Sequence, residues 1–159
     1  MGMQKIGDWE KVGLMIANLG AEMKKARELS LKAWGLKAES FALKHMRDQD
    51  LSWQPLNPHY LASKIRKGYS ENILIATSDY FQAINSWVED DTAYAGVKKT
   101  VTNSDGDVIA DIAAVHEFGA GGIGARPLWQ PVFKETMDWF MTSDKTPIRI
   151  FEKNIKKYL

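Results

Sequence analysis

Side chains that could bind a ligand or take part in a reaction lie on both sides of one glycine-rich segment, residues 119–124. His116 and Glu117 stand before it, and Arg126 follows it. A neighbouring imidazole and carboxylate could hold a metal ion or move a proton, and a guanidinium fork could pin a carboxylate through two parallel hydrogen bonds. Because glycine adopts backbone angles that other residues avoid, this segment is predicted to be a loop, either mobile or shaped by a neighbour.

A metal-centre interpretation of this segment has little support. A zinc metalloprotease helix needs a second histidine four positions after the first, and that position holds Ala120. The chain has three histidines, and the other two stand in separate helical segments or beside them. A small metal-dependent hydrolase using His116, Glu117 and Asp111 is therefore the alternative hypothesis, and metal analysis of the purified protein would test it.

Other catalytic signatures are missing from the sequence. There is no cysteine and no Gly-x-Ser-x-Gly nucleophile elbow. Ala125, Arg126 and Pro127 stand where a phosphate-binding loop would have Gly-Lys-Ser/Thr. We therefore expect a non-enzymatic protein without a cofactor or a metal.

Helices are expected on both sides of the glycine-rich loop. Residues 107–117 have a helical pattern that stops at Gly119. After the loop, residues 127–130 are predicted to add an edge strand, because proline is tolerated at a sheet margin. Pro131 then begins a helix. Five of its residues are expected to form a buried face: Val132, Phe133, Thr136, Met137 and Phe140.

The longest helical pattern lies near the N-terminus, where Asp8 can cap the first turn. We expect two helical pieces, about 8–18 and 21–48, or one long helix with a bend, because Gly20 and Gly35 each cost roughly 1 kcal/mol in a helix interior. A helix of nearly thirty residues would be about 40 Å long, so part of it should project or pack on another subunit. An apolar stripe marks the first turns: Trp9, Val12, Met15, Ile16, Leu19 and Met23.

Polar residues of the same segment are expected to face water. This solvated face consists of Glu22, Lys24, Lys25, Arg27, Glu28, Lys32 and Lys37. His45 is predicted to be a solvated residue at the helix end, where the helix dipole favours a positive charge.

The middle of the chain begins with a loop over residues 50–58. Asn57 is expected to cap a short helix that has Pro58 at its first position and stops at Gly68. The apolar run 73–76 is consistent with either a strand or the entry to the next helix. Thr77 or Ser78 can cap that brief helix, which extends over residues 80–84.

Two strands are predicted next, at residues 86–89 and 92–101, because both are rich in β-branched and aromatic residues. Asp90 and Asp91 make the connecting turn. Residues 103–106 form a second turn with an Asp-Gly signal, which could be the tip of an extended arm before residues 108–109 rejoin a strand.

Length and composition favour one domain. With 159 residues, 45% of them apolar, the chain can bury one core, which we assign to residues 1–141, followed by a basic helical tail at 142–159. The formal charge of +1 gives no reason to expect nucleic-acid binding. With no apolar run of membrane-spanning length and no signal-peptide pattern at the N-terminus, we expect a soluble cytoplasmic product.

Charge is distributed unevenly along the chain. Residues 71–117 carry nine acidic and two basic side chains, whereas residues 145–159 carry five basic side chains and one acidic. These regions are either two solvated surfaces or complementary surfaces that attract copies head to tail, an arrangement that closes into rings. The basic tail is expected to dock on the acidic middle. A membrane-surface adaptor acting through this tail is a third hypothesis, testable by liposome binding.

The order of several motifs resembles a known family. The motifs are Trp53-Gln54-Pro55-Leu56, residues 60–64 with Gly68, Ile73-Leu74 with Thr77, a β pair, residues 113–119 with His116-Glu117-Phe118-Gly119, and Ala125-Arg126-Pro127-Leu128. This order resembles the neck and tail-completion proteins of tailed phages, the virion morphogenesis family, similar to the Mu G and lambda Z proteins. The resemblance covers about residues 8–140. The chain has Ile123-Gly124 where the family usually has Ile-Pro, and Thr77-Ser78 where Thr-Gly is usual.

The resemblance implies an α+β fold with helices packed on a small antiparallel sheet. The residue pattern itself predicts the long N-terminal helical segment and the C-terminal amphipathic helix. It implies a hexameric or dodecameric ring of the chain at the head–tail junction. Neighbours would be head-closure or connector, tail terminator or tail tube proteins. DNA would pass through the ring without sequence-specific contact, and no membrane would be involved. The protein would belong to the virion, and to the host cytoplasm during assembly.

Contact surfaces are expected at the N-terminal helix, at the 103–107 turn and around the glycine-rich loop. The residues assigned to subunit or partner contacts are Trp53, Asp105, Gly106, His116, Glu117, Phe118, Gly119, Gly121, Gly122, Arg126, Pro127 and Trp129.

Overall fold

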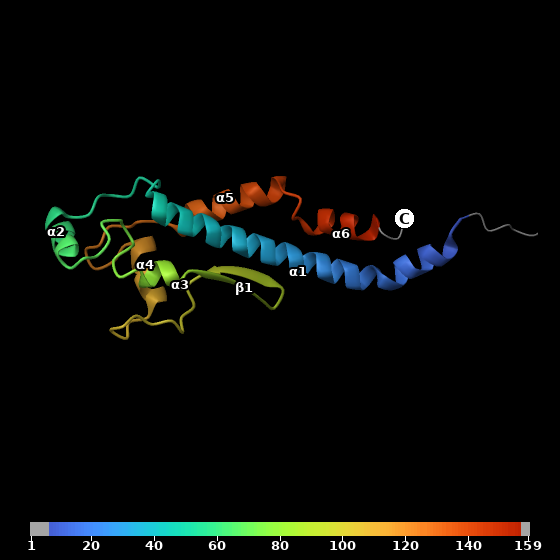
Figure 1. Ribbon diagram of the computed structural model, residues 1–159, viewed down its shortest axis with the longest axis horizontal. Helices are drawn as coiled ribbons and strands as arrows, with labels where there is room; N and C mark the ends of the chain where they lie inside the picture. The colour runs from blue at the N-terminus through green and yellow to red at the C-terminus, as the bar shows by residue number, and fades with distance from the viewer. Residues whose placement is uncertain (1–6, 157–159) are drawn as a thin grey trace, which may run out of the picture.

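A single long helix organises the fold, which is α+β as expected. The computed structural model describes residues 7–156, and α1 extends from Trp9 to Asp48 without interruption. Its 40 residues correspond to a length of about 60 Å. Figure 1 shows the helix bending toward its N-terminal end. The structure thus agrees with the single-helix expectation. Asp8 caps the helix as predicted, because its carboxylate accepts the Lys11 N–H at 3.1 Å.

The remaining elements are short and lie along α1 or beyond its C-terminal end (Figure 1). They are α2 (Pro58–Arg66), α3 (Asp79–Ala83), β1 (Asn85–Glu89), β2 (Thr92–Gly96), α4 (Ile109–Phe118), α5 (Trp129–Thr142) and α6 (Pro147–Ile155). Helices α5 and α6 run back along one side of α1, and the β1–β2 hairpin packs on α1 from the other side. No described helix is both long enough and apolar enough to cross a membrane.

Gly35 explains how the hairpin approaches α1 so closely. A Cβ atom at this position would lie 3.2 Å from the Ser86 Cβ and 3.5 Å from the Tyr94 carbonyl oxygen. The two strands pair antiparallel with Trp87 opposite Tyr94, and these two rings stack with centroids 5.3 Å apart. The glycine that weakens the helix locally therefore makes room for the sheet.

The hairpin turn has the expected residues, but the second strand is shorter than predicted. Asp90 and Asp91 both have positive φ, 46° and 57°, which is the backbone of a two-residue type I′ turn. Strand β2 ends at Gly96 because its partner β1 begins opposite it, at Asn85, directly after α3. Beyond it, the expected return to a strand is reduced to one bridge between Thr102 and Val108.

Around α2 and α3 the predicted caps are partly correct. The Asn57 carboxamide oxygen accepts the His59 N–H at 2.9 Å and caps α2. Ser78 occupies the cap position of α3 in a left-handed conformation, but its side chain makes no capping hydrogen bond. Residues 73–76 form turns and bends, so they are neither strand nor helix. The Ile73 N–H is held by the Gln49 side-chain oxygen at 2.8 Å.

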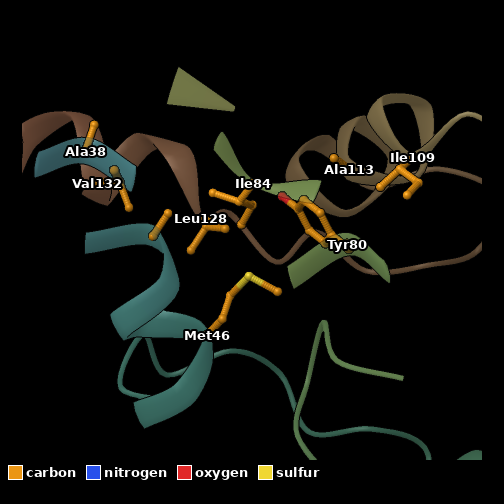
Figure 2. Close-up of a cluster of buried hydrophobic side chains, with 9 residues drawn as sticks. Ala38, Met46, Tyr80, Ile84, Ile109, Ala113, Leu128 and Val132 are labelled. Atoms are coloured by element: carbon orange, nitrogen blue, oxygen red, sulfur yellow. The ribbon is translucent and has the colours of Figure 1, made fainter. Parts of the chain in front are cut away.

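The hydrophobic core lies where the C-terminal half of α1 meets α3, α4 and the start of α5. Figure 2 shows its buried side chains converging from these elements. Met46 and Leu128 are fully buried at its centre. The members are Ala38, Ala42, Met46, Tyr80, Ile84, Ile109, Ala113, Leu128 and Val132.

Two predictions for the chain after the glycine-rich loop are wrong. Residues 127–130 form no edge strand, because α5 already begins at Trp129. Its buried face is also narrower than expected. Val132 is 1% exposed, but Phe133 is 58% and Met137 is 37% exposed. Neither side chain belongs to the buried core, and the Phe133 ring packs edge-on against Trp34 of α1 with centroids 6.3 Å apart.

Three predictions for α1 and α6 also need correction. Glu22 is buried and not solvated, and it lies on the same face of α1 as the buried residues Ala26 and Ser30. Helix α6 packs along α1. Helix α6 therefore docks on α1 and not on the acidic residues 71–117. His45 is also buried, with its Nδ1 bonded to the Asp50 carboxylate and its Nε2 3.1 Å from the Glu135 carboxylate of α5. Residues 157–159 of the predicted tail lie outside the described residues.

Candidate functional site

The Glu117 carboxylate connects the end of α4 to the beginning of α5. One of its oxygens accepts the backbone N–H groups of Leu128 at 2.7 Å and Trp129 at 3.0 Å, and the other accepts the Gln130 N–H at 3.2 Å. The first N–H groups of a helix have no partner within the helix, and a carboxylate there also interacts favourably with the helix dipole. Glu117 therefore caps α5 from a distant turn of the chain.

The glycine-rich loop is shaped by its own chain. Gly119 ends α4 with φ at 76°, and a Cβ atom there would lie 3.0 Å from the Ala125 nitrogen and 3.1 Å from the Ile123 carbonyl oxygen. The Arg126 N–H donates to the His116 carbonyl oxygen at 2.6 Å, which folds the loop back onto α4. Glycine is required at 119 both for its backbone conformation and for this close approach.

Two tryptophans fix the segments that enclose the site. The Trp53 indole donates to the Pro127 carbonyl oxygen at 2.8 Å, and the Trp129 indole donates to the Tyr80 hydroxyl at 3.2 Å. Burial raises the pKa of Tyr80 to about 12, so the hydroxyl keeps its proton at neutral pH. The loop at residues 50–58, α3 and the start of α5 are thereby held together.

A cavity of about 950 Å³ lies beside this framework, between α2, residues 73–78, α4 and the glycine-rich loop. Its wall includes the basic side chains Lys64, His116 and Arg126. Burial lowers the pKa of His116, and the nearby Arg126 guanidinium lowers it further. Burial also lowers the pKa of Lys64, whose ammonium donates to the Asn72 carbonyl oxygen at 2.6 Å.

The structure brings eight of the twelve predicted contact residues around this framework, either in its hydrogen bonds or in the cavity wall: Trp53, His116, Glu117, Gly119, Gly122, Arg126, Pro127 and Trp129. The Phe118 ring points into solvent and is 81% exposed. Gly121 lies outside the cavity wall and has positive φ, and a Cβ atom there would meet no neighbouring atom.

The other two contact residues, Asp105 and Gly106, lie in the exposed 103–107 turn. The Asn103 carboxamide oxygen organises this turn by accepting the N–H groups of Asp105 at 3.0 Å and Asp107 at 2.8 Å.

Sequence reasoning missed the roles of Lys64 and Tyr80 at this site. Lys64 belonged to the family-like motif at residues 60–64, but a lysine in a short amphipathic helix is ordinarily solvated. Its burial depends on the packing of residues 72–75 against α2, which no local pattern reveals. Tyr80 could be foreseen only as an apolar residue of α3.

The residues required by the hydrolase alternative do not form a metal site. Among residues 7–156, no group of three His, Cys, Asp or Glu side chains is placed to hold a metal ion. Asp111 is exposed, and its five-residue separation from His116 places the two about 140° apart around α4. Both Glu117 carboxylate oxygens accept backbone hydrogen bonds.

No protein-family model, curated protein or solved structure matches this chain. The interpretation of the site therefore rests on its own residues and contacts.

Proposed function

We propose that this chain is a non-enzymatic structural protein of a tailed-phage virion. In this proposal it forms a ring at the head–tail junction, the neck, and acts in tail completion or head–tail joining. The observation that carries the proposal is the N-terminal half of α1. This half projects past the hairpin (Figure 1). It carries several large apolar side chains that are exposed.

This uncovered surface, the α1 stripe, consists of large side chains at helical spacing. Ile16 is 63% exposed, Trp9 57% and Met23 47%. Exposed apolar surface costs about 25 cal/mol for each Å², and contiguous apolar patches on proteins commonly mark interaction surfaces. The full set is Trp9, Val12, Ile16, Leu19 and Met23. A neighbouring copy in a ring would cover it.

The chemistry around the glycine-rich loop also favours an assembly role. Glu117 is engaged in capping α5, so its part in the motif is structural. Phe118 points outward beside the glycine-rich loop, and Ile123 within the loop is 43% exposed. An exposed aromatic ring at the end of a helix, next to an exposed loop, is suited to contact a partner subunit.

The proposed partners follow from the family resemblance. The chain would contact further copies of itself in a ring of six or twelve, together with head-closure or connector, tail terminator or tail tube proteins. DNA would pass through the ring without sequence-specific contact. The protein would be located in the neck of the virion.

Sedimentation of the purified full chain tests the ring and the role of the α1 stripe together. We expect a closed oligomer that Ile16→Asp dissociates, because the substitution places a charge in the interface. Ala17→Asp is the matched control, since this exposed residue lies about 100° away from Ile16 around the helix.

The control variant should remain oligomeric. A wild-type chain that stays monomeric at assembly concentrations and is absent from purified phage particles would remove the proposal.

A further inference from the structure

The cavity beside the glycine-rich loop has the size and lining of a ligand site. Its volume of about 950 Å³ lies at the upper end of the range of roughly 300–1,000 Å³ found for small-molecule pockets. Three isoleucines from different segments supply part of an apolar wall: Ile75, Ile112 and Ile123.

Positive charge without a counterion distinguishes this cavity. Lys64 is 4% exposed, and neither it nor Arg126 forms an ion pair with any carboxylate among residues 7–156. The carboxyl group in the cavity wall belongs to Asp79, which accepts a hydrogen bond from the Thr77 hydroxyl at 2.6 Å. The cavity wall therefore carries two cationic side chains and one carboxylate, and that carboxylate already has a hydrogen-bond partner.

Two side chains that line this cavity each have a buried nitrogen atom without a hydrogen-bond partner among residues 7–156. These atoms are Nδ1 of His116 and Nε of Arg126. Leaving a buried polar atom unpaired costs about 1–3 kcal/mol, and more for charged groups. The Arg126 Nε–H is a donor, and the His116 Nδ1 is a donor in one neutral tautomer and in the imidazolium. Both are suited to an oxygen acceptor.

Backbone groups on the facing wall have the same polarity. Within the described chain, the N–H groups of Leu74, Ala76 and Thr77 make no hydrogen bond to protein atoms. Leu74 and Ser78 have φ of 64° and 72°. Residues other than glycine rarely adopt this backbone conformation, and it often occurs at binding sites.

We propose that this cavity binds a carboxylate joined to an aliphatic body. The carboxylate would accept hydrogen bonds from Arg126 and His116 while Lys64 adds positive charge, and the aliphatic body would lie against the isoleucine wall. Such a ligand is either a free organic acid or an acidic side chain in a peptide segment. This inference is independent of the proposed ring.

The first experiment titrates hexanoate into the isotope-labelled full chain and follows backbone amide signals by NMR. Its uncharged partner is 1-hexanol, which has the same aliphatic length. We expect hexanoate to shift the signals of residues 74–77, Ile112 and Ile123, and hexanol to bind at least tenfold more weakly. Equal binding of the two probes, or hexanoate shifts confined to other surfaces, would overturn the proposal without any variant.

Two substitutions test whether the Arg126 guanidinium binds the carboxylate. Arg126→Gln removes the guanidinium and should weaken hexanoate binding about tenfold or more, because a charge-assisted hydrogen bond is lost. Arg66→Gln is the matched control, since Arg66 is exposed at the end of α2 outside the cavity wall. Hexanoate binding that Arg126→Gln leaves unchanged in a folded variant would contradict the assignment.

An acetylated Ala-Val-Glu-Val-Ala amide and its Gln counterpart distinguish the two sources of the carboxylate. Tighter binding of the Glu peptide than of hexanoate, with loss in the Gln peptide, identifies a peptide segment. Weaker binding of the Glu peptide identifies a free acid. Both outcomes support the carboxylate site, whereas equal binding of the Glu and Gln peptides at the cavity would speak against it.

Discussion

Removing the Glu117 carboxylate should weaken the junction between α4 and α5. Its two oxygens accept three backbone N–H groups at 2.7, 3.0 and 3.2 Å. A hydrogen bond to a charged group contributes about 1.5–3 kcal/mol, and loss of a helix cap costs about 0.5–2 kcal/mol. These terms overlap because they describe the same bonds. We therefore expect Glu117→Ala to lower the free energy of unfolding by about 2–4 kcal/mol.

Glu117→Gln is expected to have a smaller effect, about 1–2 kcal/mol. The amide oxygen keeps part of the cap, but the amide nitrogen is a donor and cannot accept a backbone N–H. The negative charge at the start of α5 is also lost. Asp138→Asn is the matched control, because it removes the same charge from an exposed position within α5.

Urea unfolding measures these changes, and amide hydrogen exchange locates them. The amides of Leu128, Trp129 and Gln130 should exchange faster in both Glu117 variants, and the control should change stability by less than about 0.5 kcal/mol. A Glu117→Ala variant as stable as the control, with unchanged exchange at these three amides, would refute the capping argument.

Three further predictions concern backbone conformation and pH, and urea unfolding checks each of them. Gly119→Ala should destabilise by about 1–3 kcal/mol more than Gly122→Ala, because both have positive φ but only Gly119 meets backbone atoms within 3.1 Å; equal losses would contradict this. Gly20→Ala should stabilise by about 0.5–1 kcal/mol, and Gly35→Ala should be at least about 1 kcal/mol less favourable because the hairpin packs against it; equal gains would count against the packing argument. The hydrogen bond with the His45 imidazole lowers the pKa of Asp50 below its ordinary value of 3.8. The ionised Asp50 carboxylate therefore contributes fully to the free energy of unfolding above about pH 4, and this contribution is lost as the pH falls through the pKa of Asp50 in the folded chain. The difference in stability between wild type and Asp50→Asn should thus shrink in acid. A difference that stays constant with pH would contradict this argument.

Local patterns in the sequence predicted most of the helices but not their surroundings. The caps at Asp8 and Asn57 and the turn at Asp90 and Asp91 follow from short-range hydrogen bonding and backbone preference, so they were readable directly. The start of α5 was not, because its cap is Glu117, a residue more than ten positions earlier.

The burial of particular polar residues also could not be predicted from the sequence. Glu22 and His45 occupy positions that look solvated in an isolated helix, and only the return of α5 and α6 along α1 covers them. The same holds for Lys64, whose burial depends on the segment that follows α2. Tertiary packing decides these positions, whereas helical periodicity describes only one element at a time.

The candidate site was predicted as a set of residues but not as a structure. His116, Glu117 and Arg126 were singled out from the sequence, and the Arg126 N–H bonds to the His116 carbonyl oxygen. The expected contact of the Arg126 guanidinium with a carboxylate is not made among residues 7–156, and a contact on a neighbouring subunit stays a prediction. The cavity behind the loop was not foreseen, because residues 73–78 form irregular turns that position its wall.

Electron cryo-microscopy of the neck of the phage particle that contains this chain tests the central claim most directly. We expect a closed ring of six or twelve copies in which each α1 stripe is covered by a neighbouring subunit. A neck that contains no copy of the chain, or a ring that leaves the stripe in solvent, would contradict the account.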